Sequence, residues 1–249
     1  MIDWLRRNPR EPEAPASPVK RTVQVGDREL PLVVRRLRHA RRMTLRLSPD
    51  GSEVRISIPS WGRIGDAEAF AQERAGWLER QTQTLPPAAE PEPGATLPFR
   101  GETLIIEWEA TAPRKPVLDD GQVVVGGPRD ALARRLRQWL EAEALRLSGE
   151  DLAHFCDRAG QSTPALALSR AQRRWGSCAA DGSIRINWRL IMAPDFVRQS
   201  VVAHEVAHLV HFDHSPAFYR VLEDIYGSSV NEANRWLKAH GRSLYRHFG

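Results

Sequence analysis

A cluster of histidines most strongly constrains how this chain folds. Four of its eight histidines fall in one short segment: His204, His208, His211 and His214. The first two frame the pattern HExxH, and apolar residues recur around it with helical spacing from Phe196 to Val210. Because residues four apart on a helix share a face about 6 Å apart along the axis, both imidazoles can bind one metal ion. The sequence therefore predicts a metal-binding helix.

A catalytic zinc requires a third protein ligand and leaves one position for water. His214 is favoured, because Ser215-Pro216 is typical of a helix start and predicts a bend just before it. His211 shares the helix face but lies about 10 Å along the axis from His204, too far to close the site. Glu223 remains an alternative, since some HExxH enzymes take a glutamate from the next helix.

Glu205, beside the first histidine, is the candidate catalytic base. It would take a proton from a zinc-bound water and pass it to the leaving group. Asp213, Glu223 or Asp224 would orient the ligand imidazoles, and the sequence does not choose among them. Cys178 is expected to be a buried structural thiol rather than a nucleophile or a zinc ligand.

The composition fits a cytoplasmic globular protein. Of the 249 residues, 41% are hydrophobic and 27% charged, which excludes disordered and collagen-like chains. Two cysteines are too few for a disulfide framework or a four-sulfur zinc site, so histidines must hold any metal. The N-terminus lacks the apolar core of a signal peptide, and no apolar run is long enough to span a membrane. We expect a cytoplasmic protein with free thiols and no membrane contact.

The expected fold class is α+β, with a minimal zincin-like metallohydrolase domain preceded by a small β-rich part. We expect residues 1–20 to be a disordered or extended tail, 21–98 to be the β-rich part, and 99–249 to be the metallohydrolase domain. The β-rich part should hold an antiparallel sheet, one helix and a Pro-rich linker. Their expected bounds are 22–25, 30–36, 44–47 and 54–58 for the strands, 66–84 for the helix and 85–98 for the linker.

The metallohydrolase part should begin with a hairpin and a long helix, followed by two strands and three helices. The expected bounds are 103–106 and 123–125 for the hairpin, 129–159 for a helix interrupted near Gly149, 165–169 and 183–190 for the strands, and 195–210, 215–226 and 229–239 for the last helices, with Gly241 as a cap. The strand 183–190 is either an edge strand that pairs with an extended substrate or an ordinary strand of the sheet.

Arginines supply nearly all of the positive charge in a chain of net charge +5. Six lie close together: Arg35, Arg36, Arg38, Arg41, Arg42 and Arg46. This Arg35–Arg46 stripe is either a solvated face or a site for the phosphates of a nucleotide or nucleic acid. Asn187, Arg189 and Arg174, which precede the metal-binding helix, are candidate substrate-binding residues.

Four motifs together resemble the YgjP-like metallopeptidase-domain family of bacterial zinc hydrolases, which is related to the SprT-like and WLM proteases. They are Arg173–Cys178, Arg185–Ile191, His204–His208 and Asp213–Phe218. The resemblance extends over roughly residues 30–240. It implies a minimal zincin fold, zinc held by His204, His208 and His214, and a catalytic Glu205. The spacing is also similar to that of metzincins, but those carry glycine where this chain has His211.

The favoured function is a zinc-dependent intracellular metallopeptidase acting on a peptide or protein. One alternative is a metal-dependent nucleoside triphosphate pyrophosphatase acting on uridine triphosphate, because members of the family have also been given that name. No Walker-type glycine loop supports this alternative. Another is a DNA-associated, SprT-like protease. A non-catalytic nucleic-acid-binding module with a structural zinc is disfavoured, since such a site has no need of Glu205.

Overall fold

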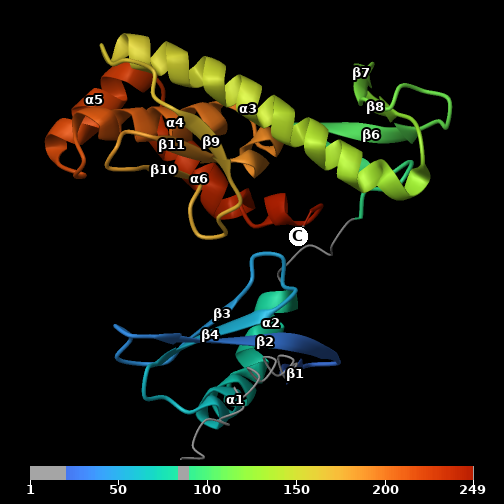
Figure 1. Cartoon of the computed structure of the whole chain (residues 1–249), viewed down its shortest axis with the longest axis vertical. Helices are drawn as coiled ribbons and strands as arrows, with labels where there is room; N and C mark the ends of the chain where they lie inside the picture. Colours follow the sequence, from blue (N-terminus) through green and yellow to red (C-terminus); the bar gives the residue numbers. More distant parts are fainter. Residues whose placement is uncertain (1–20, 84–89, 249) are drawn as a thin grey trace, which may run out of the picture. The chain divides into compact units, whose positions relative to one another are not determined.

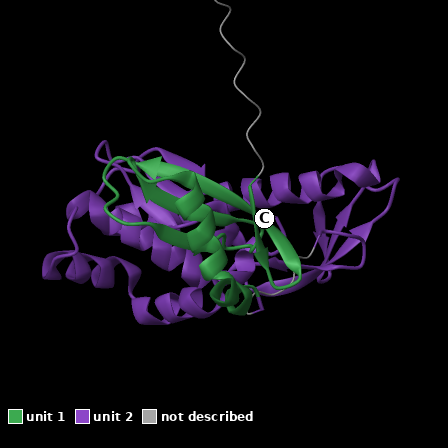
Figure 2. Cartoon of the chain, turned by 90° about the horizontal axis from the view of Figure 1, so that it is seen from below, with its two compact units in different colours: residues 1–82 green, residues 83–249 purple. Residues whose placement is uncertain are grey.

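The computed structural model describes residues 21–83 and 90–248. The chain divides into two compact units, residues 1–82 and 83–249 (Figure 2). Each unit has its own hydrophobic core. The mixture of helices and small sheets confirms the predicted α+β class. The expected tail, residues 1–20, and residues 85–89 of the expected linker lie outside the described residues.

The first unit is built on a four-stranded sheet. Its strands are β1 (Thr22–Val25), β2 (Arg28–Leu37), β3 (Thr44–Leu47) and β4 (Val54–Pro59). Their order is β1-β2-β4-β3, and the two outer pairs are antiparallel. The central pair, β2 with β4, is parallel, so the prediction of an antiparallel sheet was wrong there. Alternating apolar residues indicate which face of a strand is buried, but not the direction of its neighbour.

Two helices pack on one face of this sheet, α1 (Ile64–Glu73) and α2 (Ala75–Gln83). A single helix beginning at Asp66 was expected, but the helix begins earlier and breaks at Arg74, whose backbone leaves the helical region. Asp66 is not a cap; it lies in the first turn, where its charge favours the helix dipole. Ala67, Ala71 and Leu78 are fully buried against the strands.

The second unit begins with another four-stranded sheet. Its strands are β5 (Thr96–Phe99), β6 (Glu102–Trp108), β7 (Val117–Asp119) and β8 (Gln122–Val125), in the order β5-β6-β8-β7. Strand β5 falls in the expected linker, and the expected hairpin of β6 with β8 was wrong because these two pair in parallel. The hairpins are β5–β6 and β7–β8. Asp120-Gly121, a dipeptide typical of tight hairpin turns, was the overlooked signal for the second.

A long helix, α3 (Leu132–Arg158), follows a 3-10 turn at Arg129–Ala131 and runs from this sheet to the remaining helices (Figure 1). It continues through Gly149, where an interruption was expected. Glycine costs only about 1 kcal/mol in a helix interior. The neighbouring Leu147 and Leu152 are buried in the core, and their packing offsets that cost.

The rest of the second unit holds a three-stranded sheet and three helices. Their bounds are β9 (Leu166–Ser169), β10 (Gly176–Cys178), β11 (Ile184–Asn187), α4 (Asp195–Val210), α5 (Pro216–Tyr226) and α6 (Val230–His240), with 3-10 helices at Trp188–Met192 and Ser243–Tyr245. The three helices lie within one residue of their predicted bounds, and Gly241 caps α6 as expected. Among the described residues, none of the helices combines the length and apolar character needed to cross a membrane.

The strands beside α4 differ from the prediction. β11 ends at Asn187, short of the expected 190, because a 3-10 helix begins at Trp188. Between the strands expected at 165–169 and 183–190, the structure has a further strand, β10, which pairs with β11. The order β10-β11-β9 makes β11 the central strand, so it is not the edge strand considered from the sequence. The edge next to α4 is β10, which packs on that helix.

Candidate metal centre

Helix α4 and the bend that follows it position the three histidines. His204 and His208 lie one turn apart on α4, which ends where His211 takes an extended conformation. The chain then turns, and α5 begins at Pro216 with Ser215 as its cap, whose hydroxyl accepts a hydrogen bond from the Phe218 N–H. The predicted bend is therefore present, and it carries His214 back to α4.

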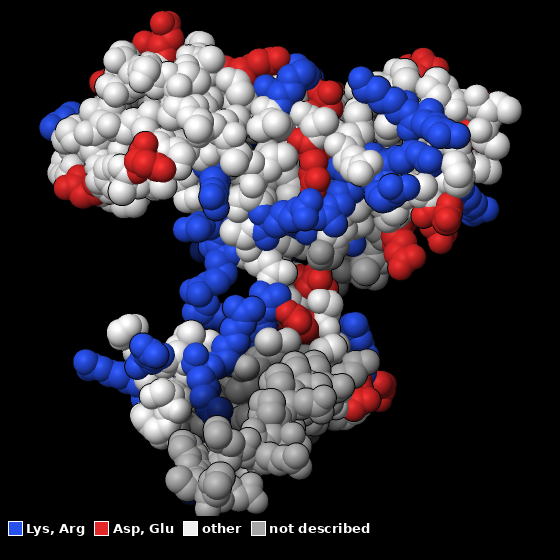
Figure 3. Space-filling model, viewed as in Figure 1, with Lys and Arg blue, Asp and Glu red and all other residues white. Residues whose placement is uncertain are grey.

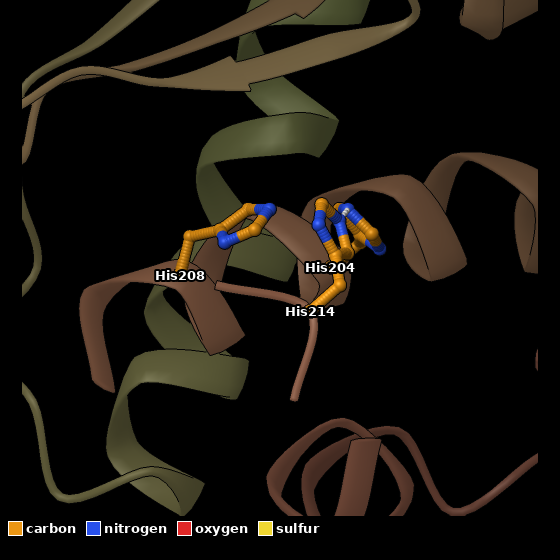
Figure 4. Close-up of side chains that lie close together, drawn as sticks. All are labelled: His204, His208 and His214. Carbon is orange, nitrogen blue, oxygen red and sulfur yellow. Dashed lines mark hydrogen bonds between the residues drawn. The ribbon is translucent and has the colours of Figure 1, made fainter. Parts of the chain in front are cut away.

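The three imidazoles point toward one another (Figure 4). One ring nitrogen from each of His204, His208 and His214 lies within 4.8 Å of the other two. The Nε2 atoms of His204 and His214 are 3.3 Å apart. Two nitrogens about 2.0–2.1 Å from a tetrahedral zinc are separated by about 3.3 Å. The donor set and the spacing of this pair therefore suit a metal ion such as zinc.

A backbone carbonyl fixes the orientation of one ring. The Nδ1 atom of His208 lies 3.1 Å from the carbonyl oxygen of His211. Because a carbonyl oxygen can only accept, the hydrogen bond places the proton of the neutral ring on Nδ1 and leaves the Nε2 lone pair for a metal. Of the carboxylates expected in this role, Asp213 instead accepts a hydrogen bond from the Ser215 N–H.

Phe218 forms the floor of the cluster. Its ring is fully buried, and its centroid lies 5.0, 4.6 and 4.9 Å from those of His204, His208 and His214. Burial, helped by the neighbouring imidazoles, lowers the pKa of His204 to about 4, and burial also lowers the pKa of His208. Both rings are therefore neutral at pH 7, as metal ligation requires. Sequence reasoning missed this role, although an apolar residue three positions into α5 was a usable signal.

The side chain of Glu205 is shielded from bulk solvent and lies against strand β10. Only 6% of the residue is exposed, and burial raises its pKa to about 7. A hydrogen bond from the Cys178 backbone N–H and the positive charge of Arg174 partly oppose this rise. A Cβ on Gly176 would overlap the carboxyl group and Cγ of Glu205, so glycine allows this close approach.

Of the three candidate substrate-binding residues, one is exposed and two are buried. Arg174 is exposed and close enough to influence Glu205. Asn187 is fully buried, where its side chain donates to the Ala171 carbonyl and accepts from the Arg189 N–H. Arg189 is 4% exposed and donates to the carbonyl of Phe248. We therefore replace the expectation that Asn187 and Arg189 bind substrate with a structural role.

The other candidate ligands stay apart from the cluster. Among the residues that the structure describes, the three histidines form the only group of at least three His, Cys, Asp or Glu side chains arranged to hold a metal. Glu223 is exposed on α5 outside this group, and His211 contributes its carbonyl only. Cys178 is a half-buried free thiol whose pKa is raised, chiefly by burial, which fits the structural role expected for it.

Comparison with known proteins matches most of the chain to one family model. The model of the YgjP-like metallopeptidase domain matches residues 41–240, a range that includes all of α4 and His214. No curated protein matches the chain. Among solved structures, the metallopeptidase zymogen of Pyrococcus abyssi abylysin is similar at 20% identity and a TM-score of 0.35, over 38% of this chain and 96% of that one. The matched family is the one that the sequence motifs resemble.

Proposed function

The chain belongs to the YgjP-like metallopeptidase-domain family and is therefore a metallohydrolase, and on this premise we propose that it is a zinc-dependent peptidase. In this proposal His204, His208 and His214 hold the zinc ion. Glu205, the next residue on α4, is the base. The observation that carries the proposal is the convergence of three ring nitrogens within 4.8 Å on the helix that carries this buried carboxyl group.

Glu205 would shuttle the proton during hydrolysis. Zinc, when bound, supplies a Lewis acid that makes water more acidic and polarises the carbonyl under attack. A carboxylate at position 205 can take a proton from the attacking water and hand it to the departing amine. A pKa of about 7 suits both steps, because the group then gains and loses a proton with similar ease near neutral pH. Arg174 would help to keep the group ionised before attack.

The neighbouring strand favours a peptide as the substrate. β10 is an edge strand, a position at which an extended peptide can add by main-chain pairing. Both Gly176 and Cys178 of this strand approach the Glu205 carboxylate. A peptide paired along β10 would therefore pass close to the base. A nucleoside triphosphate has no backbone to pair in this way, so we favour peptide hydrolysis over the pyrophosphatase alternative.

Two substrates incubated separately test this proposal. The zinc-loaded full chain would be mixed with reduced, unfolded protein and, separately, with uridine triphosphate. We expect peptide cleavage that falls about 10²–10⁴-fold in Glu205→Gln and is unchanged in Glu223→Gln, an exposed control on α5. Pyrophosphate release from uridine triphosphate that disappears in Glu205→Gln would overturn the peptidase proposal.

The two cysteines support a proposal about location. Cys156 is a buried free thiol and Cys178 a half-buried one. Free thiols are typical of reducing compartments. We therefore propose a cytoplasmic location, which fractionation of the producing cells would test.

A further inference from the structure

Within residues 21–83, the helices of the first unit cover one face of its sheet. Val54, Ile56 and Ile58 of β4 are fully buried in the core that α1 and α2 share. Successive side chains of a strand point to opposite faces, so Arg55 and Ser57 lie on the other face. Arg35 of β2 is paired with Ser57 and so shares that face. We propose that this second face, with the loop joining β2 to β3, binds single-stranded nucleic acid.

Strand register places like charges side by side on this face. Arg46 of β3 lies directly opposite Arg55 of β4, and Arg35 of β2 lies opposite Ser57, the next residue of β4 on the same face. Arg55 is neutralised by an ion pair with Glu53. Arg35 and Arg46 are exposed. β4 separates the strands that carry Arg35 and Arg46, and both side chains are exposed on this face, where an anion can bind them.

The loop after β2 adds to this charge. We call the following five exposed residues the arginine surface: Arg35, Arg38, Arg41, Arg42 and Arg46. Within residues 21–83 and 90–248, no ion pair involves any of them. Figure 3 shows lysine and arginine side chains gathered on the first unit with few acidic ones among them. A polymer of phosphates complements such a surface.

An exposed tryptophan lies at the end of the same strands. Trp61 is 77% exposed and follows β4, whose last residue, Pro59, pairs with Leu37 of β2. The guanidinium of Arg36 donates to the carbonyl of Gly62 at 3.2 Å, which holds the Trp61 loop beside the end of β2. A tryptophan seldom stays in water without a partner. Its flat ring is a surface on which an unpaired base can stack.

Exposed arginines and an exposed aromatic ring on the same strands and their loops distinguish between anionic partners. Bases in a duplex are already stacked inside the helix and cannot reach Trp61, whereas the bases of a single strand are free to stack on it. An acidic peptide offers carboxylates for the arginines but no ring to stack on the indole. The combination therefore favours a single strand, with phosphates on the arginine surface and a base on Trp61.

Fluorescence anisotropy of labelled oligonucleotides tests the proposal on the full chain. Twenty-nucleotide oligo-dT and oligo-U would be titrated from about 50 to 200 mM salt, alongside a duplex of equal length. We expect Arg35→Ala/Arg46→Ala to weaken single-strand binding at least tenfold and to reduce the salt slope by about 1.4, since each phosphate contact contributes about 0.7. Trp61→Ala should weaken binding at least about fivefold and leave the slope unchanged.

The matched control is Arg28→Ala/Arg80→Ala, which removes the same charge elsewhere on this unit. Arg28 begins β2, at the opposite end from Leu37, and Arg80 is exposed on α2. We expect its affinity to stay within twofold of wild type. An equal loss in this control would reduce the effect to general charge and overturn the proposal. Unchanged binding in Trp61→Ala, or duplex binding as tight as single-strand binding, would overturn it as well. A difference between the two single strands would tell whether DNA or RNA is preferred.

Discussion

Replacing the buried carboxyl group at position 205 should stabilise the metal-free protein above neutral pH. Burial raises the pKa of Glu205 from 4.5 to about 7. Between these values the folded chain holds a proton that the unfolded chain has released. The free energy of unfolding therefore falls as pH rises through this window, and the cost is fully present above pH 7.

The magnitude follows from the two pKa values. Each tenfold change in proton affinity corresponds to about 1.4 kcal/mol, so the buried charge costs about 3 kcal/mol at pH 8. Glutamine has nearly the same shape and cannot ionise. The stability of Glu205→Gln relative to wild type should therefore rise by about 3 kcal/mol between pH 4.5 and 8. The lowered pKa of His204 acts in the opposite direction, making both proteins more stable as pH rises from about 4 to 6.5, and cancels in the difference.

Guanidinium unfolding in the presence of EDTA measures this difference. Tryptophan fluorescence follows mainly the second unit, which contains five of the eight tryptophans: Trp108, Trp139, Trp175, Trp188 and Trp236. The exposed control Glu223→Gln should stay within about 0.5 kcal/mol of wild type at each pH. If the difference between Glu205→Gln and wild type did not vary with pH, the carboxyl group would not be desolvated, and the reasoning would fail.

Three further substitutions test the second unit. His214→Ala should weaken zinc binding at least about 100-fold in competition with a chromophoric chelator, whereas His211→Ala, which keeps the backbone carbonyl, should stay within threefold. Gly176→Ala should lower the free energy of unfolding by about 1–3 kcal/mol, because the added methyl group would overlap the carboxyl group of Glu205. A variant of wild-type stability would contradict that contact. Arg198→Met should lower the free energy of unfolding by about 3–5 kcal/mol, because Arg198 is 2% exposed and forms ion pairs with two aspartates. A loss below about 1 kcal/mol would show that these ion pairs contribute little to stability.

Local signals explain which parts of the site were predictable. The HExxH spacing needs only a helix to bring two imidazoles to one face, and the apolar residues around it specify that helix. Ser215-Pro216 marks the start of α5 through capping chemistry that operates within a few residues. Together they predict the bend that returns His214 to α4. No long-range contact had to be inferred.

The predictions that were wrong depend on contacts between segments that lie far apart in the sequence. The apolar alternation of β2 and β4 is the same for parallel and antiparallel neighbours, so it did not reveal their parallel pairing. Asn187 and Arg189 carry polar groups of the kind that bind substrates, and their burial follows from contacts with Ala171 and Phe248 that local sequence does not encode. The hydrogen bond that orients the His208 ring goes to a backbone carbonyl, which any residue type could supply.

The central claim is that three histidines hold a metal ion and that Glu205 is the base that takes a proton from the attacking water. Its most direct test is a paired measurement on Glu205→Gln, namely the zinc content per chain and the rate of peptide cleavage. We predict about one zinc per chain, as in wild type, with cleavage reduced about 10²–10⁴-fold. A zinc-loaded Glu205→Gln protein that cleaves peptides at the wild-type rate would contradict the claim.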